Sequence, residues 1–156
     1  MKNINLLYKL LLFINILFLI LLLVLIVILV IPDFLYQKPH DDKVLGIFNH
    51  LVIFCRGLLL FMGLFKIQQA LKAIIKYGFY NKVSEVRFKK GGLFLILFGV
   101  IGFIFNIIIK SELELNVFIT NFVQYFFVLL VGLGLFVFSD FIKSGTILKE
   151  ENDLTI

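Results

Sequence analysis

One charged side chain lies deep inside a long apolar stretch of this sequence. Arg56 is nine residues before Phe65, where the stretch ends, so an α-helix would place it about 14 Å from that end. A charge at such depth in a membrane costs roughly 2.5–3.5 kcal/mol on insertion scales, so it needs partners. The nearest candidates are Asn15 in an earlier apolar stretch and Ser139 and Asp140 at the end of a later one.

These four residues form a candidate intramembrane polar cluster. It could bind a substrate or an ion, or it could be a structural clamp in which amide and carbonyl groups satisfy the guanidinium of Arg56. We favour the clamp, because a functional relay usually has more than one ionisable group at depth. A third interpretation shifts the apolar stretch along the membrane, so that Arg56 reaches water.

A second group of polar side chains lies near the opposite ends of three apolar stretches. Amide side chains commonly hydrogen-bond between helices in membranes, so we interpret this group first as packing and only second as a site. The members of this candidate outer polar layer are Asn49, His50, Asn106, Asn121 and Gln124.

Spacing along the chain predicts two packing faces. Asn49, Arg56 and Gly63 are spaced by seven and share one face of a helix, which should point into the protein. A strip of small residues further along the chain predicts a close helix contact. This strip contains Gly92, Gly99, Gly102 and Asn106.

Residue patterns for catalysis or metal binding are missing from the sequence. His40 and His50 have no cysteine or further histidine at metal-ligand spacing. Cys55 lies five residues after His50, on another face of a helix, which disfavours a nucleophile and base pair. Asp140 alone does not supply the two acids of an aspartyl site, and the sequence has neither Gly-x-Ser-x-Gly nor His-Glu-x-x-His. We therefore predict no metal, no cofactor and no enzymatic activity.

The elements that carry these residues are predicted to be membrane-spanning helices. Hydrophobic residues make up 62% of the 156-residue chain, whereas about half is typical of a soluble domain. Crossing a hydrocarbon layer of about 30 Å takes roughly 20 helical residues. Four apolar runs are long enough, at about 10–31, 44–65, 91–109 and 118–138. We predict an all-α, polytopic membrane protein whose four transmembrane helices form a bundle, as a single domain over 1–156.

The first run is predicted to stay in the mature protein. It is longer than the roughly 7–15 apolar residues of a signal peptide core, and it ends at Pro32 and Asp33 rather than at a small-residue cleavage site.

The basic residues predict the orientation of the spans, because short loops rich in lysine and arginine stay in the cytosol. On one side only three are found, Lys38, Lys43 and Lys110. The other side has Lys2, Lys9, Lys66, Lys72, Lys76, Lys82, Arg87, Lys89, Lys90, Lys143 and Lys149. We expect a multi-pass protein of the inner (cytoplasmic) membrane with the N- and C-termini in the cytosol.

The segment 66–90 is the one sizeable connection between spans. Its first part has an apolar stripe, so the second span is predicted to continue as an amphipathic helix at the cytosolic interface and to end at Gly78. The stripe comprises Ile67, Leu71, Ile74 and Ile75. The segment 66–90 has seven basic residues and one acidic residue, Glu85. These basic residues could attract anionic lipid or an acidic partner, or could serve only as a topology signal. Direct nucleic-acid binding is not expected.

Two segments carry a resemblance to a known family. The end of the chain, FIKSGTILKEENDLTI over 141–156, resembles the closing motif of a bacterial family of four-span membrane proteins called domain of unknown function 2975. In the middle connection, LKAIIK over 71–76, Phe79 and VRFKKG over 86–91 are similar to a family pattern of a basic helix, Pro-Phe and a basic pair before glycine. Here Gly78 stands where the family has proline, and lysine replaces arginine.

The resemblance covers the chain from the second span to its end and implies no particular activity. Members of the family are often encoded beside a small helix-turn-helix repressor. This predicts a non-enzymatic membrane partner of a cytosolic regulator, with Glu150, Glu151 and Asp153 as a candidate docking tail. The alternative from another class is a small transporter or channel subunit that uses the polar site around Arg56.

Overall fold

Long α-helices make up nearly all of the structure. This computed structural model describes residues 2–30, 43–109 and 115–154, and of these only 78–81 lie outside helices. The described helices are α1 (Lys2–Val30), α3 (Lys43–Tyr77), α4 (Lys82–Ile109) and α5 (Leu115–Leu154). Each is long and apolar enough to cross a membrane. The predicted all-α class with four transmembrane helices is confirmed, and the described part of each predicted span lies within one helix.

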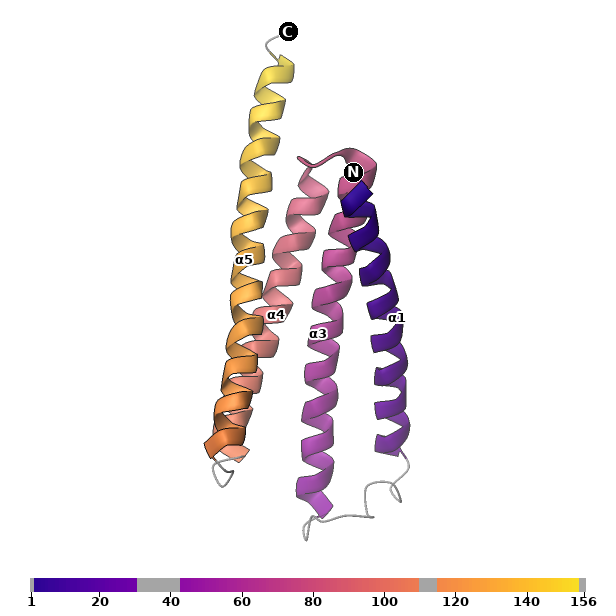
Figure 1. The fold of residues 1–156 in the computed structure, drawn as a ribbon, viewed down its shortest axis with the longest axis vertical. Coiled ribbons are helices and arrows are strands. Elements are labelled where there is room, and N and C mark those ends of the chain that lie inside the picture. Colours follow the sequence, from indigo (N-terminus) through magenta and orange to yellow (C-terminus); the bar gives the residue numbers. More distant parts are fainter. Residues whose placement is uncertain (1, 31–42, 110–114, 155–156) are drawn as a thin grey trace.

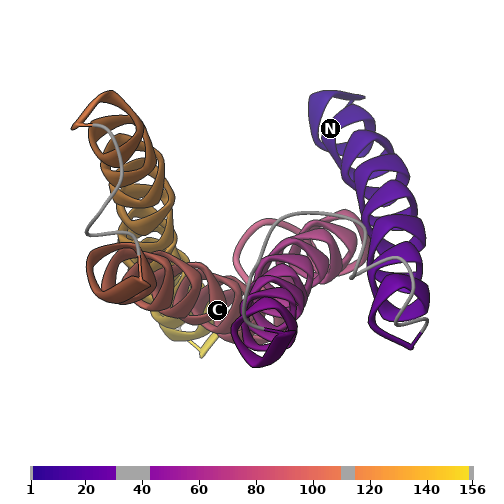
Figure 2. The same cartoon turned by 90° about the horizontal axis from the view of Figure 1, so that it is seen from below.

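The helices form a bundle that is open rather than closed. They alternate in direction, and α1 packs on α3, α3 on α4, and α4 on α5 (Figure 1). Seen along the helices, they make a curved row with α1 and α5 at its two ends (Figure 2). The turn 78–81 lies at the same end of the molecule as the N- and C-termini, and we call it the Gly78 end. The opposite end, where α4 finishes at Ile109 and α5 begins at Leu115, is the Ile109 end.

Two of the helices are much longer than a membrane is thick. α3 has 35 residues and α5 has 40, which correspond to about 52 Å and 60 Å of helix against a hydrocarbon layer of about 30 Å. The segment 66–90 is therefore mostly the end of α3 and the beginning of α4, joined by a short turn. Likewise, the segment that follows the fourth predicted span, from 139 onward, is helical as far as Leu154, and α5 rises beyond the other helices at the Gly78 end (Figure 1).

The turn between α3 and α4 is fixed by two residues. Gly78 has a φ of +89°, a conformation open to glycine, and its N–H donates to the carbonyl of Ile74 at 2.9 Å. The predicted helix end at Gly78 is confirmed. Asn81 caps the start of α4, because its Oδ1 accepts a 2.7 Å hydrogen bond from the N–H of Ser84. The Nδ2 of Asn81 donates to the carbonyl of Gly78 at 2.7 Å, which ties the cap to the helix end.

A buried apolar cluster joins all four helices at the Gly78 end. Its members are Leu11, Ala70, Leu71, Ile74, Phe88 and Ile142. The predicted apolar stripe of α3 packs inside the protein, where α1, α4 and α5 cover it, with Leu71 and Ile74 buried and Ile67 packed against them. The amphipathic continuation of the second span as a helix is thus confirmed, and its place at the cytosolic interface stays a prediction. Lys72 and Lys76 remain exposed.

Candidate functional site

Arg56 reaches from α3 toward two aromatic rings. Its guanidinium carbon lies 4.6 Å from the ring centre of Tyr125 on α5 and 5.2 Å from that of Phe98 on α4. Both distances are within the roughly 6 Å over which a cation is attracted to an aromatic face. Gly102 makes room for this contact, because a Cβ there would lie 2.9 Å from Nη2 of Arg56 and from the Tyr125 ring. One side chain of α3 is thereby joined to both α4 and α5.

The surroundings of Arg56 support a structural clamp built from rings. Its Nε is buried and has no hydrogen-bond partner in the described part of the chain. Aromatic faces attract the positive charge but accept hydrogen bonds only weakly. Arg56 and Gly63 both face α4, in agreement with their seven-residue spacing, since Gly63 lies against Leu95. The guanidinium therefore meets aromatic rings where amide and carbonyl groups were expected around it.

Asn15 does not meet Arg56, so this part of the predicted inner cluster was wrong. The Nδ2 of Asn15 donates a buried 2.6 Å hydrogen bond to Oε1 of Gln68. Gln68 is twelve residues beyond Arg56 on α3, which is about 18 Å of helix rise. Packing of α1 against α3 thus places Asn15 on the Gly78 side of Arg56. The bond joins these two helices, and Oδ1 of Asn15 is buried without a hydrogen-bond partner among the described residues.

Ser139 and Asp140 also lie far from Arg56. Ser139 is fully buried, and its Oγ has no hydrogen-bond partner within the described residues. It follows Tyr125 by fourteen residues on α5, or about 21 Å. Asp140 is exposed on the outside of the helix. The four residues predicted as one cluster are therefore distributed over two levels of the molecule, and Asp140 supplies no counter-charge to Arg56.

The structure brings together two residues of the predicted outer polar layer. Nδ2 of Asn121 on α5 lies 3.4 Å from Oδ1 of Asn106 on α4, a long hydrogen bond. Gln124 is exposed, whereas Asn49 and His50 are half-buried on α3. The contact within this layer that the structure describes therefore lies between α4 and α5. The small-residue strip on α4 faces α5 at this contact, since Gly99 lies against the backbone of Tyr125.

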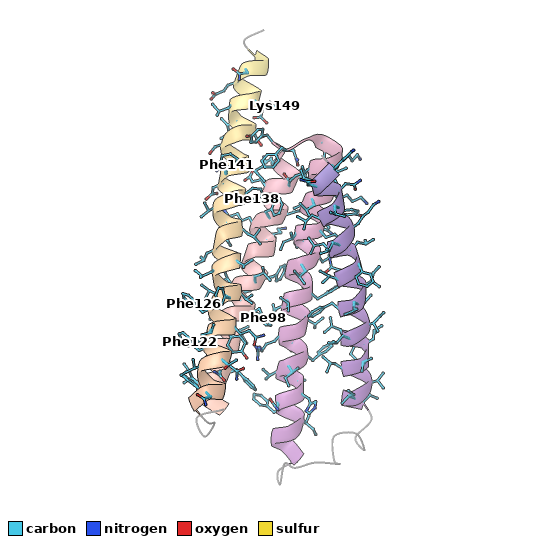
Figure 3. All side chains as sticks on the ribbon, in the orientation of Figure 1. Phe98, Phe122, Phe126, Phe138, Phe141 and Lys149 are labelled. Atoms are coloured by element: carbon cyan, nitrogen blue, oxygen red, sulfur yellow. The ribbon has the colours of Figure 1, made fainter. Side chains whose placement is uncertain are left out.

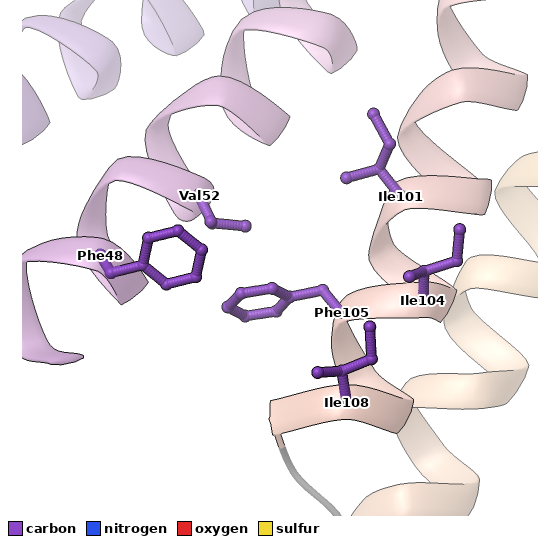
Figure 4. Close-up of a pocket in the computed structure, with 6 residues that line it drawn as sticks. All are labelled: Phe48, Val52, Ile101, Ile104, Phe105 and Ile108. Atoms are coloured by element: carbon purple, nitrogen blue, oxygen red, sulfur yellow. The ribbon is translucent and has the colours of Figure 1, made fainter.

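Between α3 and α4, the Ile109 end contains an apolar cavity of about 240 Å³ (Figure 4). It is lined by Phe48, Val52, Ile101, Ile104, Phe105 and Ile108. A cavity with this lining offers no hydrogen bonds to a polar substrate. A further cavity of about 270 Å³ between α4 and α5 has mainly apolar neighbours as well, with Tyr125 among them.

No metal site is visible among the described residues, where no three His, Cys, Asp or Glu side chains come together. Cys55 is a free and exposed cysteine. The predicted absence of a metal, a cofactor and a catalytic centre stays a prediction.

Aromatic residues of the turn hold the upper part of α5 at the Gly78 end. The ring of Phe79 meets that of Phe138 edge-on at 5.9 Å between centres, and Tyr80 lies 6.2 Å from Phe141. A Cβ at Gly145 would overlap the ring of Tyr80, so the glycine allows this close approach. Figure 3 shows Phe138 and Phe141 on this part of α5, below Lys149. Sequence reasoning missed Tyr80, although an aromatic pair directly after a helix-ending glycine was a usable signal.

The candidate docking tail belongs to the projecting end of α5. Glu150 and Glu151 are exposed, whereas the side chain of Asp153 lies outside the described residues. Two apolar side chains beside them also face outward, with Ile147 45% and Leu148 61% exposed. A surface cavity of about 400 Å³ adjoins this segment and is lined by Tyr80, Gly145, Leu148, Lys149 and Asn152. Charged and apolar groups thus alternate on a helix that stands clear of the bundle.

Comparison with known proteins gives no match: none of the family models, curated proteins or solved structures corresponds to the chain. The resemblance to the domain of unknown function 2975 family therefore stays a prediction from the sequence motifs.

Proposed function

We propose that this chain is a non-enzymatic, multi-pass protein of the bacterial cytoplasmic membrane, which binds a cytosolic protein at its Gly78 end. The observation that carries the proposal is the projecting end of α5. Ile147 and Leu148 are exposed there, two and three residues after Gly145, which lies against Tyr80 of the turn. Exposed apolar side chains are expected where a helix faces lipid. Here they lie among the charged residues Lys143, Lys149 and Glu150 of the same helix, which favours a contact with a protein.

The shape of this segment also supports binding of a partner. Tyr80 and Gly145 fix the base of the projecting helix against the turn. A helix that is already ordered loses little entropy on binding, which favours affinity. The adjoining cavity beside Leu148 has room for an apolar side chain of the partner. The resemblance noted in the sequence analysis suggests a helix-turn-helix regulator as this partner.

The orientation is part of the proposal. Lysine and arginine gather at the Gly78 end, as Lys66, Lys76 and Lys143 illustrate, and this favours a cytosolic location for that end. Both chain termini lie at the same end and would then be cytosolic as well.

Photo-crosslinking tests the partner directly. A benzoylphenylalanine at Leu148 should yield crosslinks to a cytosolic protein in cells. The matched control carries the same group at Val137, which is 72% exposed on the same helix but lies within the predicted span 118–138. We expect no cytosolic protein on Val137. A chain labelled at Lys143 should crosslink the same protein as the chain labelled at Leu148, and this Lys143 product should disappear when residues 146–156 are deleted. The same protein products at both positions would contradict the proposal.

The alternative is a small transporter or channel subunit that uses Arg56. The observation in its favour is the buried Nε of that residue, which has no hydrogen-bond partner among the described residues and could bind water or an anion. Replacing Arg56 by leucine separates the two functions. A transporter would lose flux in reconstituted vesicles, whereas the membrane partner would retain its crosslinks at Leu148.

A further inference from the structure

A basic pocket of about 460 Å³ lies between α3 and α4 at the Gly78 end. The charged side chains in its lining are all cations, namely Lys66, Lys82, Arg87 and Lys90. The rest of the lining consists of Gln69, Val83 and Val86. Converging cations without an acid among these lining residues attract a group with concentrated negative charge.

The pocket is built on a rigid helix contact. Directly below it α3 and α4 approach closely, because a Cβ at Gly91 would lie 3.2 Å from the carbonyl oxygen of Gly63. Within it, Nη1 of Arg87 donates to the carbonyl of Gln69 at 2.9 Å and so crosses from α4 to α3. This bond uses one of the five N–H groups of a guanidinium. The planar group is thereby oriented at the pocket wall, and its other donors suit a phosphate.

The position of the pocket suggests where its ligand comes from. Lys66 and Lys90 mark the boundary between the charged end of the molecule and the apolar spans 44–65 and 91–109. Below Lys90, at spacings of three and seven residues, Leu93 and Leu97 lie on the same helix face and are exposed. Met62, four residues before Lys66, is exposed on the matching face of α3. A strip of apolar surface thus continues from the pocket toward the Ile109 end.

We propose that this pocket binds the phosphate headgroup of an anionic phospholipid, whose acyl chains lie along the apolar strip below it. The cations supply the charge complement for the phosphate, as basic pockets between transmembrane helices do for acidic lipids. The strip beneath the pocket favours a lipid over a free phosphate ion. The proposal needs the apolar parts of α3 and α4 to lie in a bilayer, and it is independent of the protein partner proposed for α5.

Lipid titration followed by native mass spectrometry tests this proposal. The detergent-solubilised full chain is titrated with phosphatidylglycerol and with phosphatidylcholine. For the unaltered chain, we expect the dissociation constant of the first bound phosphatidylglycerol to be at least about tenfold lower than that of phosphatidylcholine. This is in line with the contribution of each basic residue near a lipid surface. Equal affinity for the two lipids would overturn the proposal.

Two triple variants with the same loss of charge locate the site. The pocket variant combines Lys66→Gln, Lys82→Gln and Lys90→Gln, and leaves Arg87 in place because of its bond to Gln69. The control combines Lys72→Gln, Lys76→Gln and Lys143→Gln, three exposed lysines outside the pocket lining. The pocket variant should lose the preference and the control should keep it. Equal losses would reveal a general charge effect and overturn the specific site.

Two further measurements exclude misfolding and a soluble ligand. The three pocket lysines are also replaced by arginine, which keeps the charge and should keep the preference for phosphatidylglycerol. If this variant also loses the preference while its helical circular dichroism is unchanged, charge complementarity is not the cause and the proposal fails. Inorganic phosphate is added as a competitor. Displacement of the lipid by phosphate at equal concentration would overturn the assignment to a lipid headgroup.

Discussion

At the Gly78 end, side chains from all four helices meet in one buried cluster, whereas toward the Ile109 end adjacent helices of the row pack in pairs and Arg56 reaches from α3 to Tyr125 on α5. In the proposed orientation the Gly78 end, which carries exposed lysines, lies in water, where the hydrophobic effect drives apolar groups together. Lipid tails are as apolar as the side chains, so helices in a bilayer associate instead through close packing and polar contacts. The contacts of Gly92 with Gly132, of Arg56 with Tyr125 and of Asn106 with Asn121 are of this second kind.

The largest expected effect is at the buried cluster. Ile142 has 0% exposure, so Ile142→Ala should leave a cavity and lower the free energy of unfolding by about 2–5 kcal/mol. Ile147→Ala, on an exposed part of the same helix, is the matched control and should change it by less than about 0.5 kcal/mol. Reversible unfolding in mixed micelles measures both. Similar losses for the two variants would contradict a core at the Gly78 end.

The next effect concerns the glycine contact between α4 and α5. A Cβ at Gly132 would lie 2.9 Å from the carbonyl oxygen of Gly92 and 2.8 Å from Cγ1 of Ile96, so Gly132→Ala should destabilise by about 1–3 kcal/mol. Gly134→Ala meets no heavy atom within 4 Å and should be neutral or stabilising, because alanine favours the helix. The same unfolding measurement compares the pair. If Gly134→Ala is the more harmful change, the packing face of α5 is misplaced.

A smaller effect is expected at the hydrogen bond between α1 and α3. Asn15→Leu leaves Oε1 of Gln68 without its 2.6 Å donor and should cost about 1–2 kcal/mol. The double variant Asn15→Leu with Gln68→Leu removes both polar groups and should recover most of this loss. A double-mutant cycle on unfolding free energies gives the coupling. Additive losses would mean that the two side chains do not interact.

The smallest effect is expected at the Ile109 end. The hydrogen bond from Asn121 to Asn106 is 3.4 Å long, and such bonds in membranes contribute about 0.6 kcal/mol on average, so Asn121→Ala should cost no more than that. Gln124→Ala, at an exposed position one turn further along α5, should have no measurable effect. A loss above about 1.5 kcal/mol for Asn121→Ala would show that this end depends on its polar contacts far more than proposed.

Sequence periodicity was enough to predict the elements and several of their faces. Run length gave the spans, Gly78 gave the end of α3, and the strip containing Gly92, Gly99 and Gly102 gave the face that meets a neighbouring helix. These features depend on residues close together in the chain. Their physical causes are helix geometry and the absence of a Cβ, and both act locally.

The register between helices could not be predicted in the same way. α1 is apolar on all sides, so its sequence does not determine whether Asn15 lies level with Arg56 or with Gln68. The chain has 20 phenylalanines and 5 tyrosines, and nothing local marks Phe98 and Tyr125 as the rings that receive Arg56. Such pairings depend on how whole helix surfaces interlock. The candidate inner cluster failed for this reason, whereas the Asn106 and Asn121 contact follows from two helices that are adjacent in sequence.

The proposed orientation has the helices crossing a membrane with the Gly78 end in the cytosol. Single cysteines in a Cys55→Ser background test it most directly, since Cys55 is the only native cysteine. One is placed at Ser144 on α5 and the other at Glu112, in the segment between α4 and α5 that lies outside the described residues. A membrane-impermeant maleimide should label the Glu112→Cys chain in intact spheroplasts and should label the Ser144→Cys chain only after permeabilisation. Labelling of Ser144→Cys in intact spheroplasts would contradict the account.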